Sequence, residues 1–259
     1  MDVPIVADAK EAIEKMLEYA EEKDTKEWME KIQGWEQEHP LQMKKRGNVM
    51  LPQDIIEGIN HVFDEGIIVT DVGQHQMFAA QYAEITPKKR LLMSGGLGTM
   101  GYGFPGGIGA KIGNPDKTVI VISGDGGMQM NIQEFATAVL EELPIIICVL
   151  NNTYLGMVRQ WQKLFYGKRY AMTNLLAGAA LRRGDEKLPE YTPDFVKLAE
   201  SYGAKGMRVE KKEDIEAALL EASKETKVPT LIEFIIDPEE VVYPMVKPNG
   251  TLHEMLMDC

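Results

Sequence analysis

Four short runs of aliphatic and β-branched residues constrain the fold of this chain more tightly than any other feature. They are GIIVTD (66–71), TVIVIS (118–123), PIIICVL (144–150) and PTLIEFII (229–236), and GMRVE (206–210) adds a weaker run. Strands as apolar as these are buried on both faces, as in a parallel sheet. The intervening stretches have the periodicity of helices, which we assign to residues 52–63, 78–84, 131–143, 155–165, 193–203 and 212–225. We therefore predict an α/β fold with a doubly wound, mostly parallel sheet and helices on both faces.

A different pattern precedes these strands. Residues 9–23 and 25–39 have the charged, amphipathic pattern of two helices, and a Pro- and Lys-bearing linker follows them. We divide the chain into a helical appendage with its linker, residues 1–47, and an α/β domain with a C-terminal tail, residues 48–259. Segment 174–191 breaks the alternation of strands and helices, and we interpret it as an inserted loop.

The charge and cysteine content of the chain exclude several classes of protein. A net charge of -12 argues against binding to a nucleic-acid backbone, which requires clusters of Lys and Arg. The two cysteines, Cys148 and Cys259, cannot form a disulfide framework, and they indicate a reducing, cytoplasmic compartment. No stretch approaches the ~18 apolar residues of a membrane span, and the acidic N-terminus lacks the pattern of a signal peptide. We expect no nucleic-acid or membrane partner.

Polar loops follow two of the predicted strands directly. TVIVIS leads into Gly124-Asp125-Gly126-Gly127, and PIIICVL leads into Asn151-Asn152. Right-handed crossovers bring the carboxyl ends of such strands to one edge of the sheet, so the two loops can meet over one ligand. Carboxylate and amide oxygens suit Mg²⁺ or Ca²⁺, and a helix predicted to start near Gln129 would direct its positive end to an anion. The pattern favours a metal-bridged diphosphate; the alternative is a turn and a strand terminator without a ligand.

A competing interpretation starts from residues 96–101, which read G-L-G-T-M-G and fit the dinucleotide fingerprint G-x-G-x-x-G. An acid, Asp125, follows at roughly the expected distance. The fingerprint should follow a clear strand, however, and the preceding PKKRLLMS is short, with an apolar run of three residues. Asp125 also lies inside a glycine frame rather than at the end of a strand as a lone ribose ligand. We therefore prefer the diphosphate interpretation to an NAD site.

The residues around these loops carry a family resemblance. Gly-Asp-Gly, 24 intervening residues (127–150) and Asn-Asn are similar to the thiamin diphosphate motif. The flanking segments resemble the C-terminal catalytic domain of acetolactate (acetohydroxyacid) synthase. They are VGQHQMFAAQY (72–82), SGGLGTMGYGFPGGIGA (94–110), NNTYLGMVRQWQKLFYGKRY (151–170) and VVYPMVKPNGTLHEML (241–256). Residues 1–20 resemble the last piece of the middle domain of that family.

The resemblance implies roles for individual residues. The Asp125 and Asn152 side chains and the backbone carbonyl of Tyr154 would hold Mg²⁺ against the diphosphate. The diphosphate itself would contact Gly73, Gln74, His75, Gly124, Gly126 and Gly127. Near the rings, Met100 would wedge between them and keep the cofactor bent, and Gly98, Gly156 and Met157 would lie near the aminopyrimidine. Trp161 would shape the pocket of the second substrate, so Met100 and Trp161 would influence catalysis directly. Ordinary alternatives are a loop cap for His75 and core packing for the methionines and the tryptophan.

The resemblance also implies an activity. With thiamin diphosphate and Mg²⁺, such an enzyme decarboxylates pyruvate and joins the two-carbon unit to a second 2-keto acid in branched-chain amino acid biosynthesis. The activating glutamate of the family belongs to an N-terminal domain of a partner subunit, and Glu134 and Glu142 are not credible substitutes. The FAD site of the family lies mostly in its middle domain. We therefore expect a fragment or one half of a split enzyme, inactive alone, that forms a homodimer or pairs with a chain carrying the other domains, with a regulatory subunit as a further expected partner.

Two rival functions remain open. One is a separate thiamin diphosphate-binding subunit of another enzyme, such as a 2-oxoacid oxidoreductase or a sulfopyruvate decarboxylase. The content of only two cysteines argues against a subunit that ligates its own iron–sulfur cluster, and GMVRQWQ favours the synthase. The other rival is a binding or assembly module that has kept the fold without catalysis.

Overall fold

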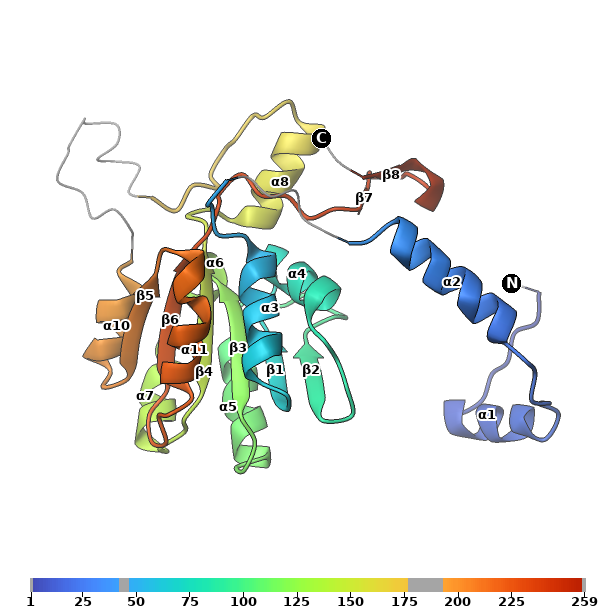
Figure 1. Cartoon of the computed structure of the whole chain (residues 1–259), viewed down its shortest axis with the longest axis horizontal. Coiled ribbons are helices and arrows are strands. Elements are labelled where there is room, and N and C mark those ends of the chain that lie inside the picture. The colour runs from blue at the N-terminus through green and yellow to red at the C-terminus, as the bar shows by residue number, and fades with distance from the viewer. Residues whose placement is uncertain (1, 42–46, 177–192, 258–259) are drawn as a thin grey trace. The chain divides into compact units, whose positions relative to one another are not determined.

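The computed structural model of the chain describes residues 2–41, 47–176 and 193–257 (Figure 1). It contains two compact units, Met1–Gln42 and Met43–Cys259. Most of the predicted insertion 174–191 therefore lies outside the described residues. In the described parts of the chain, no helix has the length and the apolar character needed to cross a membrane.

The first unit contains two helices, α1 (Ala9–Leu17) and α2 (Lys26–Glu38), in the two stretches predicted to be helical. The Asp8 side chain caps α1 by accepting a hydrogen bond from the Lys10 backbone N–H at 2.9 Å. Neither helix buries a residue. On α2, the rings of Trp28 and Trp35 meet edge to face with their centroids 5.7 Å apart. Local capping and ring contacts therefore account for the order of this unit.

The second unit is built on a six-stranded sheet in which every pair of neighbouring strands is parallel. Its order is β2-β1-β3-β4-β6-β5. The strands are β1 (Gly66–Thr70), β2 (Lys89–Met93), β3 (Val119–Gly124), β4 (Ile146–Asn151), β5 (Lys205–Val209) and β6 (Thr230–Ile235). The predicted α/β fold with a parallel sheet is confirmed.

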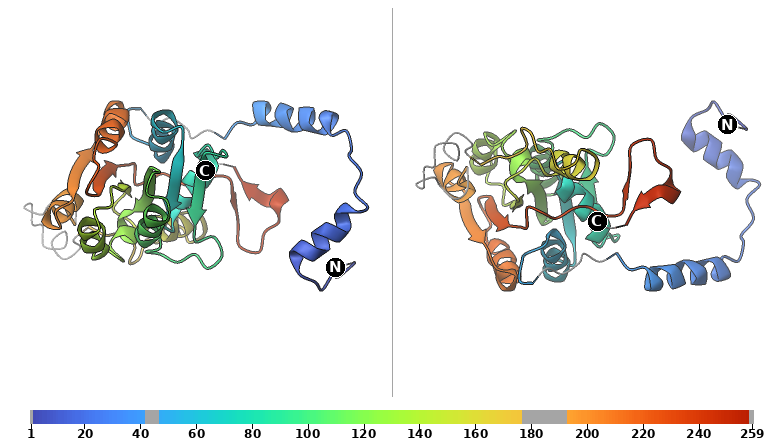
Figure 2. Two further views of the ribbon diagram at one scale, coloured as in Figure 1. Left: turned by 90° about the horizontal axis from the view of Figure 1, so that it is seen from below. Right: turned by 90° about the horizontal axis from the view of Figure 1, so that it is seen from above.

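Helices cover both faces of the sheet (Figure 2). They are α3 (Pro52–Val62), α4 (Gln74–Tyr82), α5 (Gly103–Gly113), α6 (Asp125–Met128), α7 (Glu134–Leu140), α8 (Gly156–Phe165), α10 (Phe195–Ser201) and α11 (Ile215–Ala222). One buried cluster joins strand residues such as Ile122 and Phe234 to α3, α4 and α11. The other joins Val121 and Val149 to α5, α7 and α10. Strands with apolar residues on both faces supply both clusters, as the sequence pattern predicts.

The strand order locates the ligand crevice of the domain. From β1 the chain crosses to β2 on one side, whereas β3, β4, β6 and β5 lie on the other side. Ligands of doubly wound sheets bind beyond the carboxyl ends of the strands at such a switch point, here between β1 and β3. In Figure 1, α8 lies above this edge of the sheet. A tail follows β6 and ends in a small antiparallel pair, β7 (Met245–Val246) and β8 (Met255–Leu256), with the short helix η2 (Leu252–Glu254) before β8.

Three elements differ from the sequence prediction. PKKRLLMS contains the edge strand β2, with Lys89 paired to Gly66, so a strand does precede the G-x-G-x-x-G stretch, where we expected no clear one. The glycine-dense stretch contains α5, where a Cβ at Gly107 would lie 2.4 Å from Val121 Cγ2, so glycine permits close packing of this helix on the sheet. No helix begins near Gln129, because α6 ends at Met128 and α7 begins at Glu134. Between these two helices, the Asn131 side chain donates to the Gly101 carbonyl at 2.7 Å.

Candidate functional site

The loops that follow β1, β2, β3 and β4 converge on one cavity at the carboxyl edge of the sheet. Twelve of the predicted site residues line it: Gly73, Gln74, His75, Met100, Gly124, Asp125, Gly126, Gly127, Asn152, Tyr154, Gly156 and Met157. Gly98 and Trp161 are not among the lining residues. Gly98 is exposed in a left-handed turn with φ 63°, and Trp161 packs against Phe165 with their ring centroids 5.1 Å apart. The cavity therefore gathers the predicted diphosphate and metal residues more completely than the residues predicted for the second substrate.

Asp125 is the one acidic residue predicted to bind metal, and it lies at the junction of β3 and α6. Its Oδ1 accepts the Gly126 N–H at 2.9 Å, whereas its Oδ2 is buried and has no hydrogen-bond partner among the described residues. Burial raises the pKa of Asp125 to about 7. The Gly126 N–H opposes that change, as do the nearby N–H groups of Thr153 and Tyr154, which themselves donate to Asn151 and Asn152. A buried carboxylate with one unused oxygen beside a cavity is suited to a cation.

Asn152 and Tyr154 reach the same cavity from the turn after β4. Asn152 Oδ1 accepts the Tyr154 N–H at 3.0 Å, and its Nδ2 donates to Gln74 Oε1 at 3.3 Å. The described residues contain no group of three or more His, Cys, Asp or Glu side chains placed to hold a metal ion. A cation at Asp125 would therefore depend on neutral oxygens and on oxygens of a bound ligand, which is the coordination that Mg²⁺ adopts with phosphates.

His75 lies in the first turn of α4, two residues after Gly73, whose φ of 153° and ψ of -162° suit glycine alone. The buried ring donates a hydrogen bond to the Asp71 backbone, while its Nε2 has no partner within the described part of the chain. Burial lowers the pKa of His75 to about 4, with the Asp71 carboxylate acting in the opposite direction. At neutral pH the ring is therefore uncharged and presents Nε2 as an acceptor. A contact between Nε2 and a diphosphate oxygen requires a proton on that nitrogen.

Asp71, at the end of β1, is a buried residue that the sequence analysis did not select. Its Oδ1 accepts the N–H groups of Val72 at 2.8 Å and Gly101 at 3.0 Å. Its Oδ2 accepts the Gly103 N–H at 2.7 Å. Asp71 thereby fastens the loop that carries Met100 to the end of β1. The sequence did contain a signal, because Asp71 directly follows strand β1 just as Asp125 directly follows strand β3.

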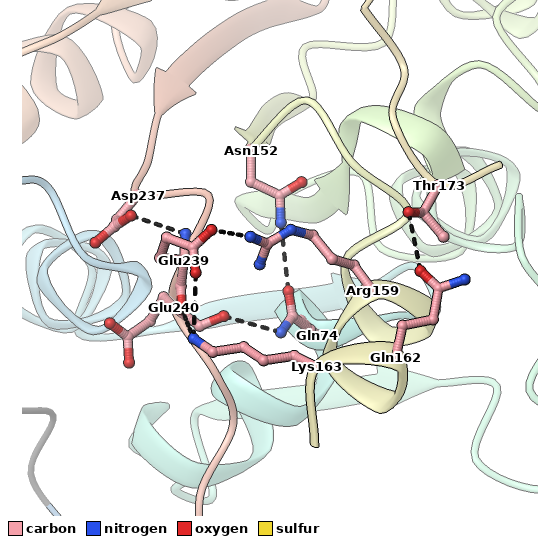
Figure 3. A network of polar contacts seen from close by, with 9 residues as sticks. All are labelled: Gln74, Asn152, Arg159, Gln162, Lys163, Thr173, Asp237, Glu239 and Glu240. Carbon is pink, nitrogen blue, oxygen red and sulfur yellow. Dashed lines mark hydrogen bonds and ion pairs between the residues drawn. The ribbon is translucent and has the colours of Figure 1, made fainter. Parts of the chain in front are cut away.

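Helix α8 and the C-terminal tail enclose the site through polar contacts that sequence reasoning also missed (Figure 3). Gln74 Nε2 donates to the Glu240 carbonyl at 3.2 Å, as Figure 3 shows. It also donates to Gln160 Oε1 at 2.7 Å. Gln160 in turn bonds both the N–H and the carbonyl of Val242. These bonds join the start of helix α4, helix α8 and the tail into one framework.

The buried Arg159 side chain of α8 strengthens the same framework. Its guanidinium carbon lies 4.7 Å from the ring centroids of both Tyr154 and Tyr170, and it forms an ion pair with Glu239 of the tail. Lys163 also donates to the Glu239 carbonyl at 3.0 Å. No local sequence pattern indicates the contacts of Glu239 with Arg159 and Lys163, since these residues are about 80 positions apart along the chain.

Comparison with known proteins relates this site to one cofactor. Residues 71–234 match the family model described as "Thiamine pyrophosphate enzyme, C-terminal TPP binding domain". The chain is 41% identical over 258 residues to the acetolactate synthase large subunit of Cyanidium caldarium. It is 36% identical over 264 residues to the acetolactate synthase isozyme 3 large subunit of Escherichia coli K12. It is 41% identical over 274 residues to the probable acetolactate synthase large subunit of Methanococcus aeolicus.

The extent of these matches is uneven. They cover 98–99% of this chain but 41–44% of the relatives, so the chain spans about two fifths of the length of the curated relatives it matches. The family match begins at Asp71 and ends at Phe234. It therefore includes all four loops around the cavity and four of the six strands in full.

Proposed function

The chain belongs to the thiamine pyrophosphate enzymes, and from this premise we propose that it is the cofactor-binding part of an acetolactate synthase large subunit. Similarity to several such subunits over nearly the whole chain supports the proposal. The structural observation that carries it is the buried, unused Oδ2 of Asp125 in a cavity shared with Asn152 and Tyr154. A site with that donor set is suited to a divalent cation that bridges to a diphosphate.

The lining residues fit such a group. In the proposal, Asp125, Asn152 and the Tyr154 carbonyl hold Mg²⁺. The diphosphate is bound by Gly73, Gln74, Gly124, Gly126 and Gly127, and by His75 once the anion has favoured a proton on its Nε2. Met100 and Met157, with Gly98 and Gly156, lie toward the rings. Thiamin diphosphate, when bound, supplies the electron sink for loss of CO₂ from a 2-keto acid.

The protein contributes position and exclusion of water. Met100, Leu155 and Met157 contribute apolar side chains to the cavity lining, which would keep water from the reacting carbon. In the proposal, pyruvate is the first substrate, and Trp161 on α8 borders the position of a second 2-keto acid, as expected in branched-chain amino acid biosynthesis. A second copy of the chain or of its relatives, a regulatory subunit, and FAD bound mainly outside this segment belong to the same proposal.

Calorimetric titration with thiamin diphosphate in the presence and absence of Mg²⁺ tests the cofactor site. We expect binding that requires Mg²⁺ and that weakens about 100-fold in Asp125→Ala, the upper end of what loss of a metal-site partner costs. Asp116→Ala is the matched control, because Asp116 is an exposed acid before β3, at the opposite edge of the sheet. No binding by the unaltered chain, or equal binding by Asp125→Ala, would contradict the proposal.

Product analysis separates the synthase from other thiamin diphosphate enzymes. The chain would replace the matching segment of the Escherichia coli isozyme 3 large subunit, to which it is 36% identical. We expect this hybrid to form acetolactate from pyruvate, and the hybrid carrying Asp125→Ala to form none. A cofactor-binding hybrid that releases only acetaldehyde would instead favour a decarboxylase, and one without any turnover would favour a binding module.

A further inference from the structure

A series of buried and partly buried polar side chains runs across the sheet from the start of α10 to the end of β4. It ends beside the turn after β4 that carries Asn152 and Tyr154, which we call the metal loop. Glu233 in β6 lies between Arg208 in β5 and Val149 in β4, in register with both. Asn151 is two residues beyond Val149, so it points to the same face of the sheet as Glu233. Glu233 is completely buried, with 0% of its surface exposed. A charge in that position needs partners on both of its oxygens.

Glu233 has those partners. Its Oε1 accepts from Asn151 Nδ2 at 2.7 Å, and its Oε2 accepts from Arg208 Nε at 2.7 Å. Arg208 extends this series of polar side chains by donating through Nη2 to Asp194 Oδ1 at 3.0 Å. Asp194 is also the N-cap of α10, where its side chain accepts the Lys197 N–H. The four side chains from Asp194 to Asn151 form one continuous relay of hydrogen bonds.

The relay determines which way the Asn151 amide faces. An ionised Glu233 only accepts hydrogen bonds, so it must face the Asn151 NH₂ group and not its oxygen. The Asn151 oxygen is thereby directed to the Thr153 N–H, which it accepts at 2.9 Å. Thr153 has a φ of 61°, a left-handed conformation that is unfavourable for a β-branched residue. Asn151 therefore stabilises a strained turn, and Glu233 holds Asn151 in the orientation that allows it to do so.

We propose that Glu233, held by Arg208, is a positioning residue for the metal loop. By fixing Asn151 it maintains the turn at Thr153, and that turn brings Asn152 and Tyr154 to the cavity that contains Asp125. This inference rests on the proposed function, because it takes Asn152 and Tyr154 as ligands of the cation beside the diphosphate. Glu233 itself lines no part of that cavity.

A reciprocal exchange tests the relay. In Asn151→Asp, two carboxylates face each other where the parent has a 2.7 Å hydrogen bond. In Glu233→Gln, one of the two donors loses its acceptor. In the double variant, the Gln amide can donate to Asp while its oxygen accepts from Arg208, and the net charge equals that of the parent. The double variant therefore restores the relay with the hydrogen-bond direction reversed at one position.

The first measurement is the Mg²⁺ affinity in the presence of thiamin diphosphate. We expect each single variant to bind about 10- to 100-fold more weakly, as is usual when a metal ligand loses its outer support. The double variant should recover to within about threefold of the parent. Glu225→Gln is the control, since Glu225 accepts three backbone N–H groups at the opposite edge of the sheet. It should leave the Mg²⁺ affinity unchanged even where it lowers stability.

The second measurement needs no cofactor. Amide hydrogen exchange at Thr153 and Tyr154 should accelerate in each single variant and return to the parent rate in the double variant. Parent-like exchange and affinity in the folded Asn151→Asp variant would overturn the inference, as would a folded double variant that recovers neither. Absence of Mg²⁺-dependent binding by the parent would overturn the proposed function, whereas the exchange data would still decide the role of the relay. Arg208→Lys, which keeps a charge and a donor, gives the same two readouts should Asn151→Asp not fold.

Discussion

A buried aspartate follows each of the strands β1 and β3, but the two carboxyl groups differ in how many of their oxygens are hydrogen-bonded. Asp71 uses both oxygens to accept three backbone N–H groups. Asp125 uses Oδ1 in the same way but leaves Oδ2 without a partner among the described residues. Because buried polar groups in native proteins are almost always bonded, the complete set fits a structural role, and the incomplete set supports the ligand site that we propose at Asp125. The residue type is the same, and unused bonding capacity distinguishes the two side chains.

The largest effect should come from removing the saturated carboxylate. In Asp71→Ala, the N–H groups of Val72, Gly101 and Gly103 lose their acceptor, and each buried unsatisfied group costs ~1–3 kcal/mol. We expect the free energy of unfolding of the ligand-free chain to fall by about 4 kcal/mol in urea titrations. The exposed control Asp116→Ala should change it by less than about 0.5 kcal/mol. A loss for Asp71→Ala as small as that of the control would show that these bonds do not stabilise the loop.

In contrast to Asp71→Ala, Asp125→Asn should weaken cofactor binding and leave the stability of the ligand-free chain unchanged. The Asn side chain keeps an acceptor for the Gly126 N–H but loses the charge, so the affinity for Mg²⁺ with thiamin diphosphate should drop about 100-fold, or ~2.7 kcal/mol. Stability of the ligand-free chain should not fall at pH 8, since burial disfavours the Asp125 charge and raises its pKa to about 7. Calorimetry and urea titration on the same samples measure both effects. If Asp125→Asn destabilised the ligand-free fold as Asp71→Ala is expected to, the contrast between the two strand ends would be lost.

The sequence was sufficient to predict the parts of the fold that leave a local mark. Four strands are apolar on both faces, and this pattern identified them as members of a parallel sheet. Strand β2 was missed because it is an edge strand with one exposed face, and its Lys89 and Arg90 resemble loop residues. Helix α5 was missed because its glycines have low helix propensity, although Gly107 is needed for contact with Val121. Tertiary packing overrides local preference in both elements.

The candidate site, like the fold, could be predicted only where a local sequence pattern indicates it. Asp125 and Asn152 follow strands directly, so the geometry of a parallel sheet brings them together. Asp71 follows the same rule and could have been found by it. The bonds from Gln74 to Gln160 and from Asn151 to Glu233 span 86 and 82 residues, and no spacing in the sequence specifies them. Polar groups that complete one another across the fold become visible only in the three-dimensional arrangement.

The Asp125 pKa of about 7 also predicts a pH dependence of binding. The cation requires the ionised carboxylate, so protons compete with it below about pH 7, and the affinity should fall by up to about tenfold per pH unit. Above pH 7 the affinity should be nearly constant. Calorimetry between pH 5.5 and 8.5 measures this slope. Asp125→Asn is the control, because the slope that remains in it belongs to the ligand, and an unchanged slope would exclude Asp125 as its source.

In the ligand-free chain, ionisation of Asp125 should lower the free energy of unfolding as pH rises, whereas it strengthens cation binding over the same range. Its folded-state pKa is raised, so the stability contributed by the protonated carboxyl is complete below pH 3.8 and is lost as pH rises to about 7. For His75 the folded-state pKa is lowered to about 4 from 6.5, so its contribution to stability increases across that interval. The two contributions oppose each other up to about pH 6.5. Only the difference between the parent and Asp125→Asn isolates the carboxyl.

The smallest expected effect is a change in the pKa of His75, which should respond to Asp71 and not to Asp125. The Asp71 carboxylate raises the pKa of His75 against the stronger effect of burial, whereas Asp125 does not contribute to that shift. In Asp71→Asn, which keeps the size of the side chain, the pKa of His75 should fall below about 4 by less than about one unit. In Asp125→Asn it should stay where it is. Histidine ring nitrogen chemical shifts recorded from about pH 3 to 7 report the protonated fraction on both sides of the parent pKa. Equal shifts in the two variants would mean that His75 senses the net charge of the cavity and not Asp71 in particular.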